Sequence, residues 1–396
     1  MSGEDMAYDA TRITYLDGPE AVRRRPGMWV GSVGERGLHQ LVFGAVDEAV
    51  NRILAIGGGS VDVTLTRDGG VQVWDDGTPT PFRAAEGSGN SGGDEGPGAE
   101  GPGLDERLAS FHARRGPDDR RTVFVGDFGV GLFVVNALSS RLTAETRDAG
   151  VRRVQEYAYG VAVAAPSTPE PATGTGTALA FWPDRGIFET TRCSFAVLAE
   201  RLRQVAFLNP GLGISLTDER TAGAARSVRF RFPDGVRDFV AALDAESGPL
   251  VSSDVIGFAR DDPRMAGSMQ VALLWRGFGA ERVLGFVNSL ATPEGGTHLD
   301  GFRDGVTDAV AAIAGERGQL TAADSDPGAG LIGAGLTAVV SVCLDRPEIL
   351  GATRGRLGNT AVRNCVREAV RECLREAFDE RPELATEIVE RVVRRV

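Results

Sequence analysis

A long amphipathic helix constrains the fold of this chain more than any other feature. Between residues 37 and 55, apolar side chains recur at intervals of three and four, which places them in one wide stripe along a helix. A stripe of this width predicts a helix that faces a hydrophobic core. The side chains that form it are Leu38, Leu41, Val42, Ala45, Val46, Ala49, Val50 and Leu54.

Short strands follow this helix along the chain. Residues 60–65 and 70–74 alternate between apolar and polar side chains around the turn sequence Arg67-Asp68-Gly69-Gly70, which predicts a β-hairpin. The combination of a core-facing helix with strands predicts a mixed α/β fold. Further strands are expected at 153–164 and 176–182, and further helices at 132–138 and 194–206.

The chain is expected to form two domains, at 1–222 and 223–396, because its composition turns small and flexible near residue 222. In the first domain, a lid at about 84–120 is expected to be disordered, since residues 86–103 are rich in glycine, proline and acid. The second domain is expected to contain a strand at 228–232, the sequence EGGTH at 294–298, a helix at 299–313 and two amphipathic helices after Gly358.

Composition limits the partners of the chain. With 43 basic and 55 acidic residues, its net charge of −12 does not attract DNA as a whole, although a local basic groove is compatible with it. No lysine occurs, so any phosphate group must be bound by arginine. Without an apolar run of about 18 residues, a cytoplasmic protein with no membrane segment is expected. The cysteines lack CxxC spacing and are expected to be reduced, structural thiols: Cys193, Cys343, Cys365 and Cys373.

Three separate motifs have the chemistry of a nucleotide pocket. Asp75-Asp76-Gly77 ends a predicted strand, where a carboxylate can accept a hydrogen bond from an exocyclic amine and glycine lets a planar base approach. The G-x-x-G-x-G pattern at 126–131 offers backbone N–H groups and a helix N-terminus to phosphates. Gly174-Thr175-Gly176-Thr177 supplies a hydroxyl beside the base. Each motif alone is more often an ordinary turn or helix start, and their order does not fit a dinucleotide-binding fold.

The order of these motifs resembles the gyrase-B and topoisomerase-IV ParE family of the GHKL ATPase superfamily. The resemblance implies an α/β (α+β) sandwich of GHKL type that closes over ATP, followed by a transducer domain with a left-handed βαβ crossover. It also implies a homodimer formed through the N-terminal arm and contacts with gyrase subunits. The net charge of −12 leaves only weak or indirect binding of DNA expected. The matching stretches are YLDGPEAVRRRPGMWVGSVGERGLH, VWDDG, GDFGVGLFVVNALS, TGTALAFWP, AFLNPGL with LTDER, PEGGTH with GFR, and LGN.

The resemblance implies a role for each matching residue. Asp75 would read the adenine with Thr177 as its companion, and Gly77 would lie beneath the base. Arg147 would flank the base pocket, and Arg354 would reach the γ-phosphate from the transducer loop. The residues that match the phosphate cradle are Gly126, Gly129, Val130 and Gly131, and those that match aromatic residues of the arm are Tyr8 and Trp29.

The sequence departs from the family pattern at the catalytic positions. Gly44 and Gln40 replace the acid that polarises the attacking water and the histidine that orients it, and neither can accept a proton near neutral pH. Loss of a general base costs about 10²–10⁴ in rate, so hydrolysis is expected to be slow or absent. Glu48 replaces a magnesium-binding Asn, and its carboxylate can still bind Mg²⁺. The other departures are Asn51 and Arg52 for two acids, Thr78-Pro79 for Arg-Gly, Arg114-Arg115-Gly116 for Gly-Gly-Lys, Phe128 for His, and Ala352-Thr353-Arg354 for Gln-Thr-Lys.

Three interpretations of function follow. The first is a gyrase-B-like ATPase–transducer module that binds nucleotide but is impaired in hydrolysis. The second is a non-catalytic interaction or regulatory protein that acts on gyrase or another partner. The third is a repurposed pocket with a new ligand, in which Glu48 serves as a substitute base.

Other expectations concern the histidines and the cleavage machinery of the family. His39 is expected to be packed, His298 to serve the fold or an interface, and His112 to lie in the lid. Neither the acid cluster of the family's TOPRIM domain nor its active-site tyrosine module occurs in the sequence. We therefore expect no strand passage by these residues alone.

Overall fold

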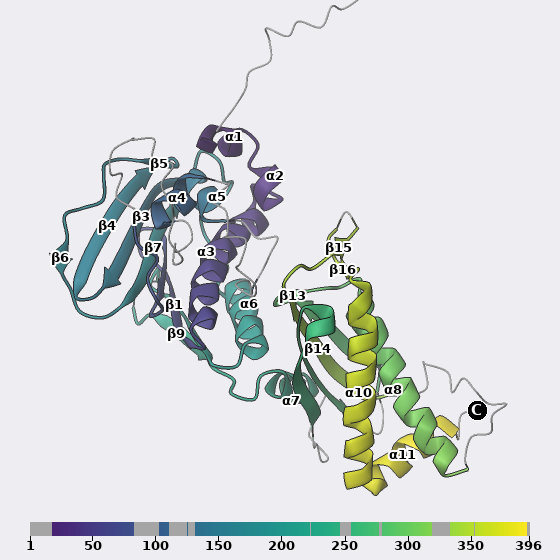
Figure 1. Ribbon diagram of the computed structural model, residues 1–396. Helices are drawn as coiled ribbons and strands as arrows, with labels where there is room; N and C mark the ends of the chain where they lie inside the picture. The colour runs from purple at the N-terminus through teal and green to yellow at the C-terminus, as the bar shows by residue number, and fades with distance from the viewer. Residues whose placement is uncertain are drawn as a thin grey trace, which may run out of the picture.

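The computed structural model describes residues 18–82, 103–110, 125, 131–221, 223–245, 255–276, 279–318, 333–351 and 353–393. They form two α/β units that follow each other along the chain (Figure 1). Each unit has its own cluster of buried apolar side chains. The expected α/β fold is therefore confirmed. No helix of the described residues is long and apolar enough to cross a membrane.

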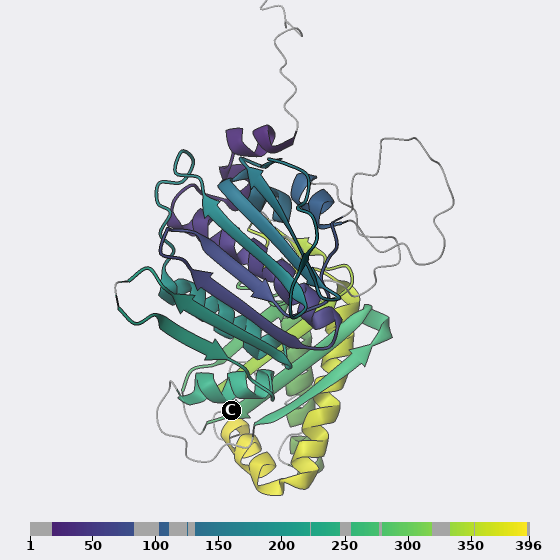
Figure 2. The same cartoon turned by 90° about the vertical axis from the view of Figure 1, so that its left-hand side faces the viewer.

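The first unit is built on a nine-stranded sheet in the order β5-β4-β3-β7-β2-β1-β8-β9, with β6 paired to β4. β1 and β8 are parallel neighbours, and β2 pairs antiparallel with both β1 and β7. Figure 2 shows the face of this sheet that the helices leave open. The strands are β1 (Gly59–Leu65), β2 (Val71–Asp75), β3 (Ser139–Asp148), β4 (Val151–Ala158), β5 (Val161–Ala162), β6 (Glu170–Pro171), β7 (Gly176–Pro183), β8 (Leu212–Asp218) and β9 (Arg226–Phe230).

Helix α3 (Glu35–Ala55) packs its apolar stripe against the other face of this sheet. The expected stripe residues from Leu38 to Val50 are buried, whereas Leu54 is half-buried and Ile53 takes its place in the core. The prediction of a core-facing helix is therefore confirmed. The remaining helices of the unit are α1 (Gly18–Arg24), α2 (Gly27–Val30), α4 (Leu104–Ala109), α5 (Leu132–Ala137) and α6 (Phe195–Leu208).

The second unit is a five-stranded sheet in the order β10-β11-β14-β12-β13. Its parallel neighbours β12 and β14 are connected through α8, which is a βαβ arrangement. Helices α8 and α10 lie side by side, and α7 packs on the opposite face of the sheet (Figure 1). The elements are α7 (Val236–Ala245), β10 (Ile256–Asp262), β11 (Gly267–Trp275), β12 (Arg282–Val287), β13 (Leu290–Ala291), α8 (Thr297–Glu316), β14 (Leu336–Leu344), β15 (Ile349–Leu350), β16 (Arg356–Leu357), α10 (Thr360–Glu380) and α11 (Pro382–Val393).

The structure differs from the sequence expectations in three places. A helix, α4, forms inside the expected disordered lid, because Leu104 and Leu108 lie one turn apart and are both fully buried. The expected single strand at 153–164 is a hairpin, because Tyr159 and Gly160 have φ values of 54° and 88° and reverse the chain. Strand β9, which the expected boundary at 222/223 places in the second domain, is hydrogen-bonded to β8 of the first sheet.

Candidate nucleotide site

Helix α3 carries the two expected catalytic positions on consecutive turns. Gly44 is buried and Gln40 is exposed, and neither offers a side chain that can take a proton. One turn further along, Glu48 Oε2 accepts a hydrogen bond from Arg107 Nη2 of α4 at 2.7 Å. The side chains of Glu48 and Arg107 are only 18% and 25% exposed, so this ion pair is largely shielded from water. The carboxylate expected to substitute for the missing base is therefore already paired.

The end of β2 and the start of β7 bring two of the sequence motifs together. Asp75 and Thr177 are direct partners in the antiparallel register of these strands, and both side chains are fully buried. Gly176 permits this approach, because a Cβ at that position would lie 2.0 Å from the carbonyl oxygen of Asp75. The N–H of Gly77 donates to Asp75 Oδ1 at 3.2 Å. A carboxylate, a hydroxyl and a glycine thus meet at one point.

Arg52 of α3 lies against this carboxylate. Its Nε and Nη2 donate to Asp75 Oδ2 at 3.1 Å and 2.6 Å. The Arg52 side chain is 8% exposed, so both charges of the pair are buried. Arg52 Nη1 and Thr177 Oγ1 are also buried, and neither has a hydrogen-bond partner among the described residues. The sequence marks Arg52 only as a departure from the family pattern, and this contact was not predicted.

Arg147 lies beside the same strands, on β3. In the β3–β7 register it is opposite Gly176, next to Thr177. Its Nε donates to Glu145 Oε1 at 2.7 Å, and its guanidinium lies 4.8 Å from the centre of the Trp74 ring. Burial would raise the pKa of Glu145, but its hydrogen bonds to Arg152 and Arg147 lower it overall. Arg147 therefore lies near Thr177 and is already bound to an acid.

The glycine motif that the sequence assigns to phosphate binding is described only in part. Gly126, Gly129 and Val130 lie outside the described residues, as do Phe128 and 114–116. Gly131 immediately precedes α5 and accepts a hydrogen bond from the N–H of Val134. Val125 is fixed to α3 by two bonds with the Asn51 side chain, one to its N–H and one to its carbonyl, both at 3.0 Å. Asn51 thus anchors the chain just before the glycine motif.

The other sequence candidates lie away from this point. Arg354 belongs to the segment between β15 and β16 of the second unit, where it has a φ of 52°. Trp29 packs against the core of the first unit, and Tyr8 lies outside the described residues. The structure therefore brings Asp75, Gly77 and Thr177 together with Arg147 nearby, and places Arg354 in a different unit.

Two of the three histidines, His39 and His298, are buried and hydrogen-bonded within the fold. His112 lies outside the described residues. His39 is buried and its Nε2 accepts from the N–H of Ser194 at 2.9 Å, and burial lowers its pKa. His298 is fully buried with Nε2 3.0 Å from Thr292 Oγ1, and burial lowers its pKa to about 4. None of the four cysteines is joined to another in a disulfide, and burial raises the pKa of Cys193 to about 12.

One further titratable group lies on α3. The Asp47 side chain is 13% exposed, and its Oδ1 lies 3.8 Å from Arg201 Nη2 of α6. Burial raises the pKa of Asp47 to about 6, the positive charge of Arg201 opposes this shift, and the negative charge of Glu48 adds to it. Nothing in the sequence singles out this residue, because its position on the helix does not reveal how deeply α6 covers it.

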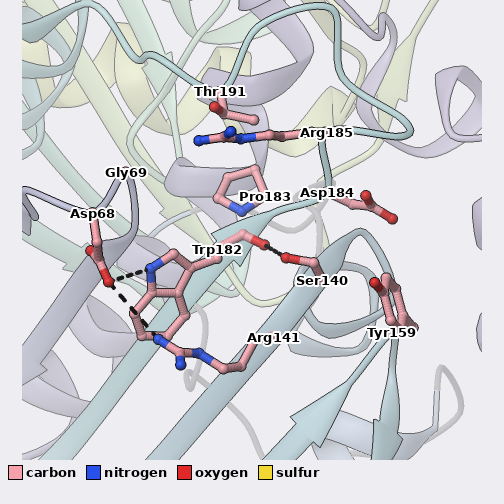
Figure 3. Close-up of a pocket in the computed structure, with 10 residues that line it drawn as sticks. All are labelled: Asp68, Gly69, Ser140, Arg141, Tyr159, Trp182, Pro183, Asp184, Arg185 and Thr191. Atoms are coloured by element: carbon pink, nitrogen blue, oxygen red, sulfur yellow. Dashed lines mark hydrogen bonds and ion pairs between the residues drawn. The ribbon is translucent and has the colours of Figure 1, made fainter.

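Figure 3 shows the residues that line a cavity of about 460 Å³, among them Trp182 and Pro183. These two residues end β7, whereas Thr177 lies at its start. Four of the residues that line the cavity contact one another, namely Asp68, Ser140, Arg141 and Trp182. Trp182 Nε1 donates to Asp68 Oδ2 at 2.9 Å, and the Arg141 guanidinium lies 3.7 Å from the centre of the Trp182 ring. Ser140 Oγ donates to the carbonyl of Trp182 at 3.2 Å. The mutual pairing of these groups favours a structural role, so the candidate site remains at Asp75.

Known proteins resemble the chain along most of its length. A family model described as DNA gyrase B matches residues 235–396. The DNA gyrase B protein of Streptomyces coelicolor is 40% identical, in a match that covers 91% of this chain and 53% of that protein. The novobiocin-resistant DNA gyrase B protein of Streptomyces niveus is also 40% identical, over 98% of this chain and 58% of that protein. The chain thus spans a little over half the length of these relatives.

Solved structures match both units together. The 43K ATPase domain of Thermus thermophilus gyrase B, solved with an aminocoumarin, aligns with a TM-score of 0.79 and 28% identity over 95% of this chain and 94% of that one. The topoisomerase IV ATP-binding domain of Francisella tularensis shares the fold, with a TM-score of 0.74 and 24% identity over 96% and 97% of the two chains.

Proposed function

The chain belongs to the DNA gyrase B family of GHKL ATPases, and on that premise we propose that it is an ATPase–transducer module that no longer hydrolyses ATP. The observation that carries this proposal is the face of α3. Gly44 and Gln40 stand where the base and its orienting group would lie, and Glu48 is paired with Arg107. A module without a general base loses about 10²–10⁴ in rate from this change alone.

The residues at the base end do not fit adenine as they are arranged. Reading adenine requires a carboxylate oxygen free to accept from its exocyclic amine. Asp75 Oδ2 already accepts two N–H groups from Arg52, and Oδ1 accepts from Gly77. Magnesium meets a similar difficulty, since the Glu48 carboxylate is bound to Arg107. This arrangement supports no step that uses ATP or Mg²⁺.

Without turnover, the module acts through binding. The retained fold aligns with gyrase B along both units, so its surfaces for other subunits are the parts that function can still use. We propose a non-catalytic partner that forms a homodimer through its N-terminal arm or associates with gyrase subunits. The relatives in Streptomyces are themselves DNA gyrase B proteins. Use of Glu48 as a substitute base is not favoured, because its carboxylate is already bound to Arg107.

Phosphate release tests this proposal. The purified chain is incubated with ATP and Mg²⁺, and inorganic phosphate is measured beside the 43K ATPase domain of Thermus thermophilus gyrase B as the active reference. We expect release at the level of a protein-free blank, at least about 10² below the reference, because no base is present at Gly44 or Gln40. Robust magnesium-dependent release by the wild-type chain would refute the proposal.

A further inference from the structure

We propose that Arg52 determines the specificity of the base pocket: it occupies the carboxylate of Asp75 from within the chain and excludes adenine. The inference rests on the proposed function, in that it takes Asp75 and Thr177 as the base end of the nucleotide pocket. It concerns binding and not turnover, so its test has a separate readout.

Arg52 and Gly77 occupy three of the about four acceptor positions of the Asp75 carboxylate. Arg52 binds Oδ2 with two N–H groups, at 3.1 Å and 2.6 Å, and the N–H of Gly77 binds Oδ1 at 3.2 Å. Asp75 itself is fully buried, so no other approach to its oxygens is open. An incoming adenine amine reaches this carboxylate only if the guanidinium withdraws.

The exchange of Arg52 for adenine is unfavourable. Arg52 brings an opposite charge and two N–H groups to the Asp75 carboxylate, whereas the adenine amine would bring a neutral donor. Withdrawal also leaves a guanidinium that is 8% exposed without its counter-ion, and an unpaired buried charge is strongly disfavoured. Arg52 is fixed on α3, whereas a free nucleotide must lose translational freedom to bind. Each of these effects favours the internal pair.

The neighbouring hydroxyl gives independent support. Thr177 lies directly opposite Asp75 in the β2–β7 register, and its Oγ1 is buried without a hydrogen-bond partner among the described residues. Buried hydroxyls in folded proteins are nearly always paired. Asp75 and Thr177 are the two residues expected to contact a base. Arg52 binds the carboxylate of the first, and the hydroxyl of the second is left without a partner among the described residues, as expected if Arg52 has displaced the base.

The test removes the guanidinium and asks whether adenine binding appears. A magnesium complex of the β,γ-imido analogue of ATP is titrated calorimetrically into wild type, Arg52→Ala, and Arg52→Ala with Thr78→Arg. The double variant keeps the net charge and moves the cation to exposed position 78, where the family pattern has arginine. Arg220→Ala is the matched control, because it removes an arginine from another shielded pair, with Asp218, whose side chains are 14% and 11% exposed.

Wild type and Arg220→Ala are expected to give no saturable heat, whereas both Arg52 variants bind at least tenfold more tightly than wild type. Adding Asp75→Asn to Arg52→Ala is expected to cancel this gain, since the amide no longer offers a charged acceptor. The proposal would be overturned if wild type bound the analogue as tightly as the Arg52 variants do. It would also be overturned if the Arg52 variants were folded and bound the analogue no more tightly than wild type. The wild-type titration alone decides the first outcome, whatever the variants do. Tight binding by wild type without phosphate release overturns this inference and leaves the proposed loss of hydrolysis standing.

Discussion

Asp47 and Glu48 are neighbours on α3, yet the fold gives their carboxyl groups different surroundings. Glu48 accepts a hydrogen bond from Arg107 at 2.7 Å. The guanidinium that faces Asp47, from Arg201, is more distant, at 3.8 Å. Burial therefore dominates at Asp47 and raises its pKa to about 6 from the ordinary value of 3.8. An ionised Asp47 costs the folded state stability at neutral pH.

This shift predicts a pH-dependent effect of Asp47→Asn. Because the pKa of Asp47 is higher in the folded state, its contribution to stability is fully present below about pH 4 and is lost as the pH rises through about 6. The amide is uncharged at every pH, so we expect it to raise the free energy of unfolding at pH 8 by up to about 3 kcal/mol, with no change at pH 4. Urea unfolding of wild type and Asp47→Asn at pH 4 and pH 8 measures this change in the free energy of unfolding.

Asp218→Asn is the control for this measurement, because it is expected to change the free energy of unfolding at pH 8 in the opposite direction. The hydrogen bond from Arg220 lowers the pKa of Asp218, so its ionised form stabilises the fold above the ordinary pKa and the contribution is lost as the pH falls. Asp218→Asn should therefore destabilise the protein at pH 8. Equal effects of the two substitutions at pH 8 would contradict the account of Asp47.

The chemistry of single residues could be predicted from the sequence only where local order fixes it. Asp75, Gly77 and Thr177 follow from strand ends and turn residues, and the structure brings them together. The pairing of Arg52 with Asp75 could not be predicted, because it depends on how α3 crosses β2. The substitution at position 52 was visible in the sequence, but its consequence requires the packing of a helix on a sheet.

At the scale of elements, α8 and α10 are held together by close backbone contact. A Cβ at Gly301 of α8 would lie 2.2 Å from the carbonyl oxygen of Arg363 on α10, and one at Gly305 would lie 2.6 Å from that of Arg367. Exposed ion pairs such as Arg363–Asp304, at 2.7 Å, flank the contact. Exposed pairs of this kind contribute about 0–1 kcal/mol each, so the close approach of the two helices is the larger contribution.

Gly301→Ala is expected to lower the free energy of unfolding by about 1–3 kcal/mol, because the added methyl group forces the helices apart. Gly315→Ala on the same helix is the matched control, since a Cβ there meets nothing within 4 Å. At an exposed helical position alanine is favoured over glycine by up to about 1 kcal/mol. Thermal unfolding of both variants measures the difference. A Gly301 variant as stable as the Gly315 variant would contradict close packing at this contact.

Periodic elements were predictable from the sequence, and elements set by turns or burial were less so. The stripe of α3 and the hairpin of β1 and β2 match their expected positions to within a residue or two. The prediction of a single strand at 153–164 was wrong, because the sequence does not reveal the positive φ of Tyr159. Helix α4 was missed because only two buried leucines, Leu104 and Leu108, stand out from a stretch rich in glycine and acid.

At the scale of the whole molecule, the two units are joined by a few polar contacts and a shared apolar cluster. Arg201 of α6 donates to the carbonyl of Ser289 at 2.7 Å, and Asn209 donates to Ser289 Oγ at 2.9 Å. Phe207 packs with Phe239 of α7 and Phe286 of β12 in the same cluster. Arg201 also faces Asp47, so one side chain connects α3 to the second unit. The order of the two units was predictable from the sequence, but these contacts between them were not.

Phosphate release by the Arg52→Ala, Thr78→Arg variant tests the central claim most directly. If this variant binds the nucleotide, absence of release can no longer be attributed to an empty pocket. We predict that at saturating ATP and Mg²⁺ it releases no phosphate above the protein-free blank, because Gly44 and Gln40 still provide no base. Magnesium-dependent release at a rate comparable to the Thermus thermophilus 43K domain would contradict the account.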